Sequence, residues 1–93
     1  MEIFHLFAPP IYWSDEIKLF DHCSGKMSVK LDFDTEAMGP STFSIRIHLP
    51  TSFTPIEFIG PANKVIELPE ECFYLKVSLK SHFTGQQIIC KVS

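Results

Sequence analysis

Hydrophobic and polar residues alternate with a period of two in two segments between residues 27 and 49. The hydrophobic positions are Met27, Val29, Leu31, Phe33, Phe43, Ile45, Ile47 and Leu49. Successive side chains of a β-strand point to opposite faces of its sheet, so this spacing predicts two strands, each with one face in the core. We expect the two strands to form a hairpin-like unit across a turn, with Lys30, Asp32, Arg46 and His48 on the polar face.

Residues 72–92 repeat this pattern and predict a second hairpin-like unit. Its inward series is Phe73, Leu75, Val77, Leu79, Ile88, Cys90 and Val92, and its outward series is Tyr74, Lys76, Ser78, Lys80, Ile89 and Lys91. A loop over residues 81–86, which contains Gly85, separates the two strands. Two such units are able to close one hydrophobic core between them.

The rest of the chain consists of extended segments separated by turn residues. We expect further strands at residues 2–7, 56–59 and 64–68. Pro9 ends the first of them, because proline cannot donate a hydrogen bond to a sheet, and residues 60–63 form a turn between the other two. Ser24 and Gly25 predict another turn, which joins the strand at Met27 to the segment before it as a hairpin.

Residues 11–20 fit neither the helical nor the strand period well. Ser14 followed by Asp15 and Glu16 is typical of a helix start and would give one short helix near residues 14–20. The β-branched and aromatic residues of the same segment favour a strand. We favour the strand and keep the helix as the alternative.

The turn residues recur at short intervals, and no long segment has the helical period. The sequence therefore predicts an all-β fold, either a small antiparallel β-sandwich or a partly open barrel of six to eight strands. With 93 residues, the chain is expected to form a single domain over residues 1–93.

Charge and composition argue against several classes of partner. Eight basic and eleven acidic residues give a net charge of -3, and the lysines are dispersed, which argues against nucleic acid. No hydrophobic run approaches the roughly 20 residues of a membrane-spanning helix, which argues against a membrane partner. The cysteines Cys23, Cys72 and Cys90 are an odd number without close spacing, and no secretory leader is visible, so we expect a cytoplasmic location.

The sequence contains no motif that predicts catalysis, a cofactor or a metal site. Asp32, Asp34 and Glu36 alternate as in a calcium-binding loop, but Ala37 and Phe43 stand where that loop needs a glycine and a bidentate glutamate. The four histidines and three cysteines lack the closely spaced ligand pairs that are typical of zinc sites. An enzyme that depends on Cys and His is therefore a distant alternative.

Aromatic residues in irregular segments are the candidates for a binding surface. Tyr12 and Trp13 lie just before Asp15 and Glu16, and Phe53 lies in a loop bounded by prolines. Tryptophan and tyrosine are enriched at binding hot spots because they offer a large rigid area with one polar group. The alternative for Trp13 is that its ring caps an open end of the sandwich, and Phe53 has the same two interpretations.

These observations predict a non-catalytic cytoplasmic domain that binds another protein, as an inhibitor, an immunity-type antagonist or an adaptor. The alternative is a structural subunit of a homo-oligomer or virus-like assembly whose edge strands pair between chains. Neither function requires a cofactor or a metal.

Overall fold

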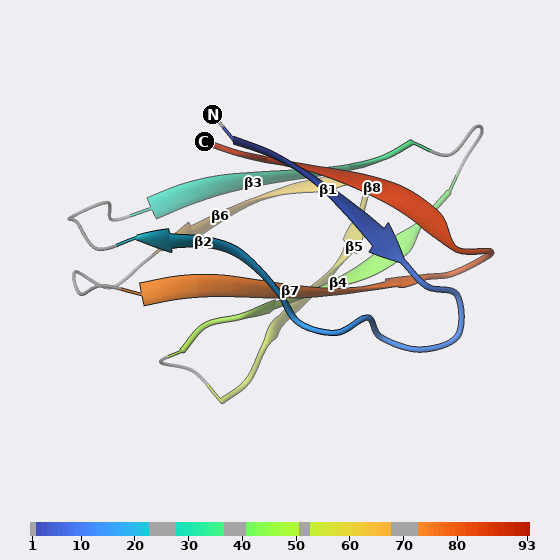
Figure 1. Ribbon diagram of the computed structural model, residues 1–93, viewed down its shortest axis with the longest axis horizontal. Coiled ribbons are helices and arrows are strands. Elements are labelled where there is room, and N and C mark those ends of the chain that lie inside the picture. Colours follow the sequence, from blue (N-terminus) through green and yellow to red (C-terminus); the bar gives the residue numbers. More distant parts are fainter. Residues whose placement is uncertain (1, 23–27, 37–40, 51–52, 68–72) are drawn as a thin grey trace.

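In the computed structural model, the described residues form eight β-strands and no helix (Figure 1). The described residues are 2–22, 28–36, 41–50, 53–67 and 73–93, with the backbone alone described for 20–22 and 73. The strands are β1 (Glu2–Ala8), β2 (Ile17–His22), β3 (Ser28–Thr35), β4 (Phe43–His48), β5 (Ile56–Gly60), β6 (Ala62–Glu67), β7 (Phe73–Ser81) and β8 (Gln86–Val92). Within these ranges there is accordingly no helix capable of crossing a lipid bilayer.

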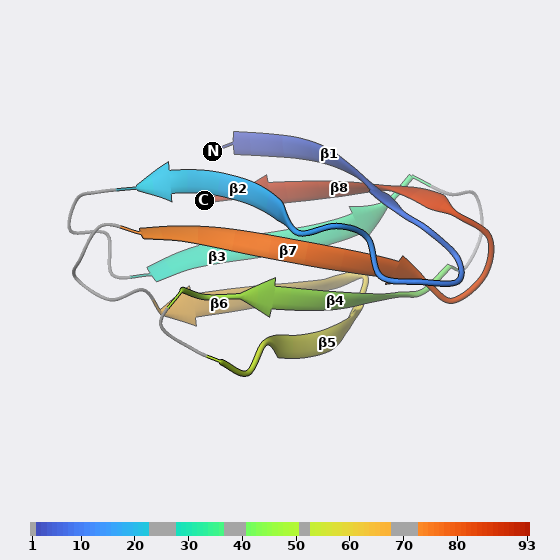
Figure 2. The same ribbon diagram turned by 60° about the horizontal axis from the view of Figure 1, so that its bottom comes forward.

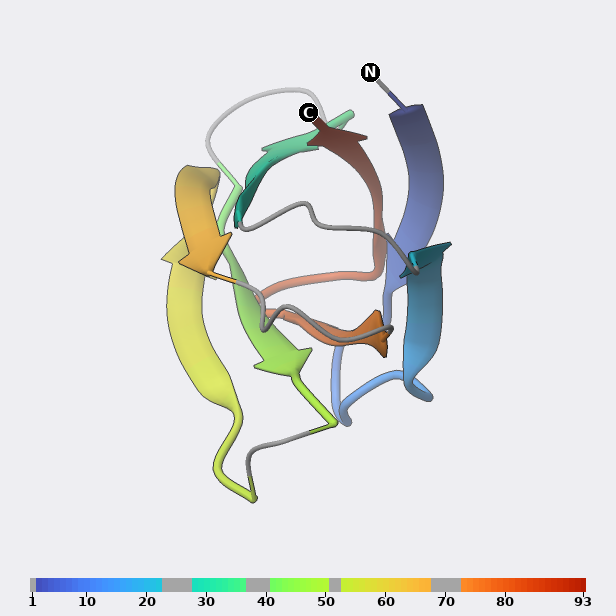
Figure 3. The same ribbon diagram turned by 90° about the vertical axis from the view of Figure 1, so that its left-hand side faces the viewer.

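The strands form two four-stranded antiparallel sheets that pack face to face. Sheet 1 has the strand order β1-β8-β3-β6, and sheet 2 has the order β2-β7-β4-β5. Figure 3 shows the two sheets as separate layers, with β1 and β2 at one side of the molecule and β5 and β6 at the other. The predicted small antiparallel β-sandwich is confirmed.

The strand pairs are those of a jelly roll. β1 pairs with β8, β2 with β7, β3 with β6 and β4 with β5, so the two halves of the chain form one long antiparallel ribbon. Rolling up this ribbon adds the pairs β3–β8 and β4–β7 and closes both sheets over one core. Because this architecture is shared by proteins of unrelated activity, the fold alone does not define the function.

The expected hairpins are wrong, because the strands assigned to each of them lie in different sheets. β3 does not pair with β4, β7 does not pair with β8, and β2 does not pair with β3, since one strand of each pair belongs to sheet 1 and the other to sheet 2 (Figure 2). The turn predicted at Ser24 and Gly25 lies outside the described residues. Alternation determines which face of a strand is buried, but it carries no information about which strand lies beside it.

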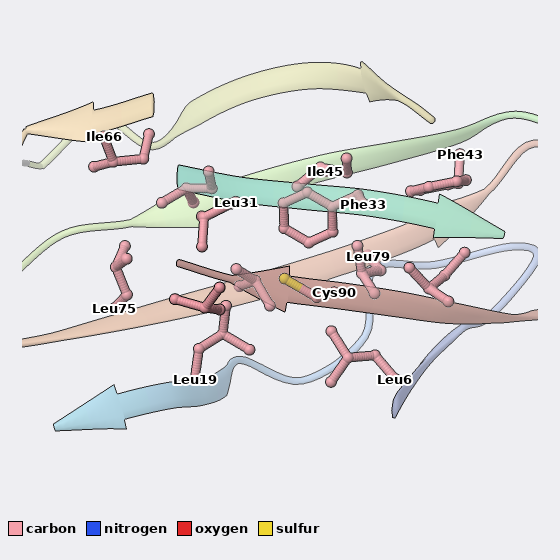
Figure 4. Close-up of a cluster of buried hydrophobic side chains, with 14 of the residues drawn as sticks. Leu6, Leu19, Leu31, Phe33, Phe43, Ile45, Ile66, Leu75, Leu79 and Cys90 are labelled. Carbon is pink, nitrogen blue, oxygen red and sulfur yellow. The ribbon is translucent and has the colours of Figure 1, made fainter. Parts of the chain in front are cut away.

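The hydrophobic core lies between the two sheets, and most of its residues are those that the alternation predicted (Figure 4). The buried members of the two units are Val29, Leu31, Phe33, Phe43, Ile45, Ile47, Leu75, Val77, Leu79, Ile88, Cys90 and Val92. Leu49 is partly buried against them. Met27 lies outside the described residues, and so does the side chain of Phe73. Phe33 also makes an edge-to-face contact with Phe58, at a centroid separation of 5.9 Å. The predicted assignment of buried faces is confirmed.

Residues 17–22 form strand β2, so the strand is confirmed for the end of the segment 11–20, while residues 11–16 lie outside any strand. The alternative of a short helix near residues 14–20 is wrong. Leu19 is buried, as the strand interpretation requires. The pairing of β2 with β7 shifts register between Lys18 and Phe20, which gives this strand an irregular ladder.

The connection between β5 and β6 is shorter than predicted. The expected turn covered residues 60–63, but Ala62 and Asn63 already belong to β6 and pair with Phe33 and Asp32 of β3. The chain therefore passes from sheet 2 to sheet 1 at Gly60 and Pro61, and both neighbouring strands stay extended up to this point.

Candidate functional site

The outer face of sheet 2, which is turned away from the core, carries a row of polar residues centred on Arg46. Arg46 of β4 lies opposite Glu57 of β5 on one side and opposite Ser78 of β7 on the other. Ser44 and His48 are its neighbours on the same face of β4. Arg46 and His48 thus point away from the core, as predicted.

The segment before β2 runs beside β7 and is attached to it by Ser14. Ser14 donates its backbone N–H to the carbonyl of Leu79 at 2.9 Å, and its hydroxyl accepts a hydrogen bond from the Leu79 N–H at 2.9 Å. Both backbone groups of Leu79 are therefore satisfied beyond the end of the β2 ladder. This attachment positions Trp13 and Glu16 over the polar face of sheet 2.

Trp13 stacks on Arg46 near the centre of this face. The guanidinium carbon of Arg46 lies 3.9 Å from the centroid of the indole ring. Glu57 holds the same guanidinium from the neighbouring strand, with 2.5 Å between Arg46 Nε and Glu57 Oε1. A cation over a tryptophan ring is favourable by about 0.5–2 kcal/mol, depending on its exposure. The two contacts together hold Arg46 and Trp13 in one arrangement.

An open groove of about 480 Å³ runs beside this stack. Its lining residues are Trp13, Ser44, Glu57, Phe58 and Ile59. Ile59 is 62% exposed, so a large apolar side chain stands next to a carboxylate and a hydroxyl. The groove therefore offers apolar contact area and hydrogen-bonding groups side by side.

His48 connects Glu16 and Ser78 on the same face. Its Nδ1 lies 3.3 Å from Glu16 Oε1, and its Nε2 lies 3.1 Å from Ser78 Oγ. Serine, histidine and a carboxylate in this order are the members of a hydrolytic triad. Ser78, however, is only 4% exposed, although it was predicted to face solvent. It lies between β4 and the attached segment, and the contacts of Trp13 with Arg46 and of Glu16 with His48 join these two elements across it. Its hydroxyl is closed to a substrate, and the three residues fasten the attached segment to the sheet.

His82, in the connection between β7 and β8, joins the start of β4 through both ring nitrogens. Its Nδ1 lies 2.8 Å from Thr42 Oγ1, and its Nε2 lies 2.6 Å from Ser44 Oγ. A neutral imidazole has one donor and one acceptor, and a hydroxyl can serve as either, so both contacts are satisfied in either tautomer. The Ser44 hydroxyl is thereby held in place at the border of the groove.

Trp13 and Glu16 are the two predicted binding residues that the structure brings together. Both lie on the outer face of sheet 2, where Trp13 contacts Arg46 and Glu16 contacts His48. Trp13 is partly buried by this arrangement and does not belong to the buried core. The alternative that its ring caps an open end of the sandwich does not fit this position.

The other three predicted binding residues are exposed but lie apart from the groove. Tyr12 directly precedes Trp13 and is 66% exposed, and Asp15, two residues after Trp13, is also exposed. Phe53 is fully exposed in the connection after β4, beyond the end of the β4–β5 ladder that is closed by the pair Ile47 and Ile56. The groove lies toward the opposite end of that ladder, so Phe53 does not line it.

Sequence reasoning missed the partners of Trp13, because they belong to strands that are distant from it along the chain. Arg46 was placed correctly on a polar face, but the alternation that places it there does not indicate that Trp13 lies beside it. Glu57 was not identified at all. The opposite charges of Arg46 and Glu57 on two consecutive strands are the pattern that would have indicated a cross-strand ion pair.

Cys90 is a buried core residue, as its place in the inward series predicted. Burial raises the pKa of its thiol to about 12, and the nearby charge of Asp32 acts in the same direction. Cys23 and Cys72 lie outside the described residues, and among the described ones no group of three or more His, Cys, Asp and Glu side chains is placed to hold a metal ion. Cys90 is thus a small hydrophobic residue rather than a nucleophile in the folded protein.

We expect the raised pKa of Cys90 to make stability depend on pH in the alkaline range. Between the ordinary value of 9.0 and about 12, the unfolded chain loses the thiol proton while the folded chain keeps it. The free energy of unfolding should therefore fall with rising pH, by about 1.4 kcal/mol per pH unit from this group. Urea denaturation at several alkaline pH values measures the slope. Cys90→Ala should reduce it, and an equal slope in both proteins would contradict the assignment.

A scan of protein-family models found no match to this chain, and neither a search of curated proteins nor a search of solved structures found a similar protein.

Proposed function

We propose that this chain is a non-catalytic domain that binds another protein through the outer face of sheet 2. The observation that carries the proposal is the stack of Trp13 on Arg46, held by Glu57, at the border of an open groove. Tryptophan and arginine are among the residue types most enriched at binding hot spots. Their contact with each other restricts both side chains before a partner arrives, which lowers the entropy cost of binding.

The groove indicates what the partner must supply. Trp13 and Ile59 favour an apolar or aromatic side chain, since both present hydrophobic area to the groove. Glu57 and Ser44 favour hydrogen-bond donors beside it, such as backbone N–H groups or a basic side chain. A partner segment that combines an apolar anchor with a neighbouring donor therefore matches the lining residues.

A domain of this size is suited to act as an inhibitor, an immunity-type antagonist or an adaptor, because it can cover a binding surface without carrying chemistry of its own. The cytoplasm is the compartment that we propose for this role. The protonated, buried thiol of Cys90 is compatible with a reducing environment.

The proposal predicts that Trp13→Ala abolishes capture of a specific partner while the protein stays folded. Wild-type protein and variant are used as baits in extracts of the native host, and circular dichroism checks that both are folded. The protein retained by the wild type alone is then purified, and its affinity is measured by calorimetry. We expect a loss of about 30-fold or more, since hot-spot truncations cost about 2 kcal/mol or more.

Phe83→Ala is the matched control for this experiment. Phe83 is also an exposed aromatic residue, but it lies in the β7–β8 connection and does not line the groove. Its truncation should leave capture of the partner unchanged. Equal retention by all three baits, or unfolding of Trp13→Ala, would show that the groove is not the binding surface.

A structural subunit of a homo-oligomer is the second candidate function. The observation that favours it is β1, an edge strand of sheet 1 that carries exposed hydrophobic residues. The two functions are compatible, because β1 belongs to sheet 1 and the Trp13 groove lies on sheet 2.

A further inference from the structure

Three of the four edge strands carry features that hinder pairing with another chain. The edges are β1 and β6 in sheet 1 and β2 and β5 in sheet 2. β2 has a register shift beside Lys18, and β6 has an exposed lysine, Lys64, near its middle. β5 is only five residues long, carries the exposed Glu57 and is followed directly by Pro61. Bulges, charged residues, prolines and short lengths are the features by which proteins protect sheet edges.

β1 has such features only at its two ends, where Glu2 is exposed and Pro9 follows Ala8 directly. It spans seven residues, contains neither lysine nor proline, and pairs with β8 without a register shift from Glu2 to Ala8. On its outer face, Ile3 is 54% exposed and Phe7 is 46% exposed. Figure 3 shows β1 at the side of the sandwich, with its second edge turned away from β8. Between Ile3 and Phe7, a backbone edge without lysine, proline or register shift thus runs beside exposed apolar side chains.

The sequence of β1 is complementary to itself in one antiparallel register. Residues directly opposite each other in an antiparallel ladder share a face of the sheet. A register centred on His5 pairs all seven residues of two copies and respects this condition. It places Ile3 of each copy opposite Phe7 of the other, which is a favourable pair of a β-branched and an aromatic residue. Glu2 falls opposite Ala8, so the acidic residues of the two copies do not meet.

We propose that two copies of this chain pair through β1, antiparallel about a two-fold axis at His5, and thereby join their copies of sheet 1 into one continuous sheet. The Phe7 ring lies against Gly85 of the β7–β8 connection, where a Cβ would be 2.5 Å from Cζ of the ring. Because each copy uses the same edge, the interface closes on itself and gives a dimer rather than a fibre. The dimer does not depend on the Trp13 groove.

The first test compares two lysine substitutions at exposed apolar residues of sheet 1. Ile3 lies on β1, and Val65 lies on β6, the opposite edge of the same sheet, where it is 62% exposed. Sedimentation velocity over a range of concentrations gives the dimer dissociation constant. We expect Ile3→Lys to raise it at least about tenfold, because two symmetry-related pairs are lost, and Val65→Lys to leave it unchanged.

Three results of this comparison would overturn the proposal. They are a wild-type protein that stays monomeric up to millimolar concentration, a dimer that withstands Ile3→Lys, and equal weakening by both substitutions. Circular dichroism verifies that each variant is folded, so that a loss of dimer is not confused with unfolding.

The second test measures the register directly with His5→Cys. At the centre of the proposed ladder the two introduced cysteines are directly opposite, and the Cα separation of about 4.5–5.5 Å suits a disulfide. Mild oxidation should then give a dimer linked through residue 5, as located by mass spectrometry, in a background with Cys23→Ser and Cys72→Ser. Lys64→Cys on β6 is the control and should stay unlinked. Similar cross-linking of both variants, or of neither, contradicts the β1 register.

Discussion

Leu31→Asp is expected to prevent folding. Leu31 lies at the centre of β3, its side chain is completely buried, and the surrounding core between the two sheets is apolar (Figure 4). The substitution removes about 1.5–3 kcal/mol of hydrophobic burial and adds several kcal/mol for an unpaired carboxyl group in the core. The free energy of unfolding of a domain of this size is about 5–15 kcal/mol, so one such change removes most of it. Circular dichroism and proton NMR dispersion should show an unfolded chain.

Lys30→Ala is the matched control, because Lys30 is the neighbour of Leu31 on the opposite face of β3. Its side chain is exposed, and the hydrogen bonds that it exchanges with Ser93 involve the backbone only, so alanine preserves them. The variant should keep its stability within about 0.5 kcal/mol. If the chain tolerated both substitutions equally, the assignment of buried and exposed faces would be wrong.

The buried face of each strand could be predicted from the sequence because it is a local property. Leu31 and Val77 are both fully buried, and each sits in a run whose alternate residues are hydrophobic. In a strand, residues two apart lie on the same face, so this spacing alone predicts which face is buried, whatever the rest of the chain does. This rule was sufficient to define the all-β class and nearly all of the core.

The partner of each strand could not be predicted, because it depends on contacts between distant segments. β3 lies between β6 and β8, and β4 lies between β5 and β7, although β3 and β4 are consecutive in the chain. A polar connection of moderate length serves equally well for a hairpin or for a crossing between sheets. In this protein the crossing places the buried faces of β3 and β4 in opposite sheets over one core.

The candidate site was predictable only in part for the same reason. Trp13 was selected from its residue type and its irregular setting, and the structure places it in a groove. Arg46 and Glu57 complete the stack only because β4 and β5 pair and Ser14 fastens the preceding segment to β7. Each of these contacts joins two elements of the fold, and the hydrophobic alternation does not predict which elements lie side by side.

Gly60→Ala is expected to destabilise the protein by about 1–3 kcal/mol, which is the cost of inserting atoms into a packed core. Gly60 is buried at the end of β5, where the chain leaves sheet 2. A Cβ there would lie 2.7 Å from two ring atoms of Phe43 and 3.0 Å from Cδ1 of Ile45, and both side chains are fully buried. Urea denaturation should show a lower midpoint with an unchanged dependence on denaturant.

Gly85→Ala separates this steric effect from the general effect of replacing glycine. A Cβ at Gly85 would also come too close to an aromatic ring, at 2.5 Å from Cζ of Phe7, but that ring is half exposed and can rotate away. Neither glycine has the left-handed backbone conformation that disfavours alanine. The gain from a less flexible unfolded chain, about 0.4–1 kcal/mol, should then offset most of the cost at Gly85.

A double variant tests whether the Phe43 ring is the obstacle to a larger residue at Gly60. If the Phe43 ring is the obstacle, Phe43→Leu removes part of the group that an alanine Cβ would strike, so Gly60→Ala should cost less in that background than in the wild type. The difference between the two costs is the coupling energy of the pair, and contacting core residues typically show about 0.5–3 kcal/mol. Additive losses would show that the Phe43 ring is not the group that a Cβ at Gly60 strikes.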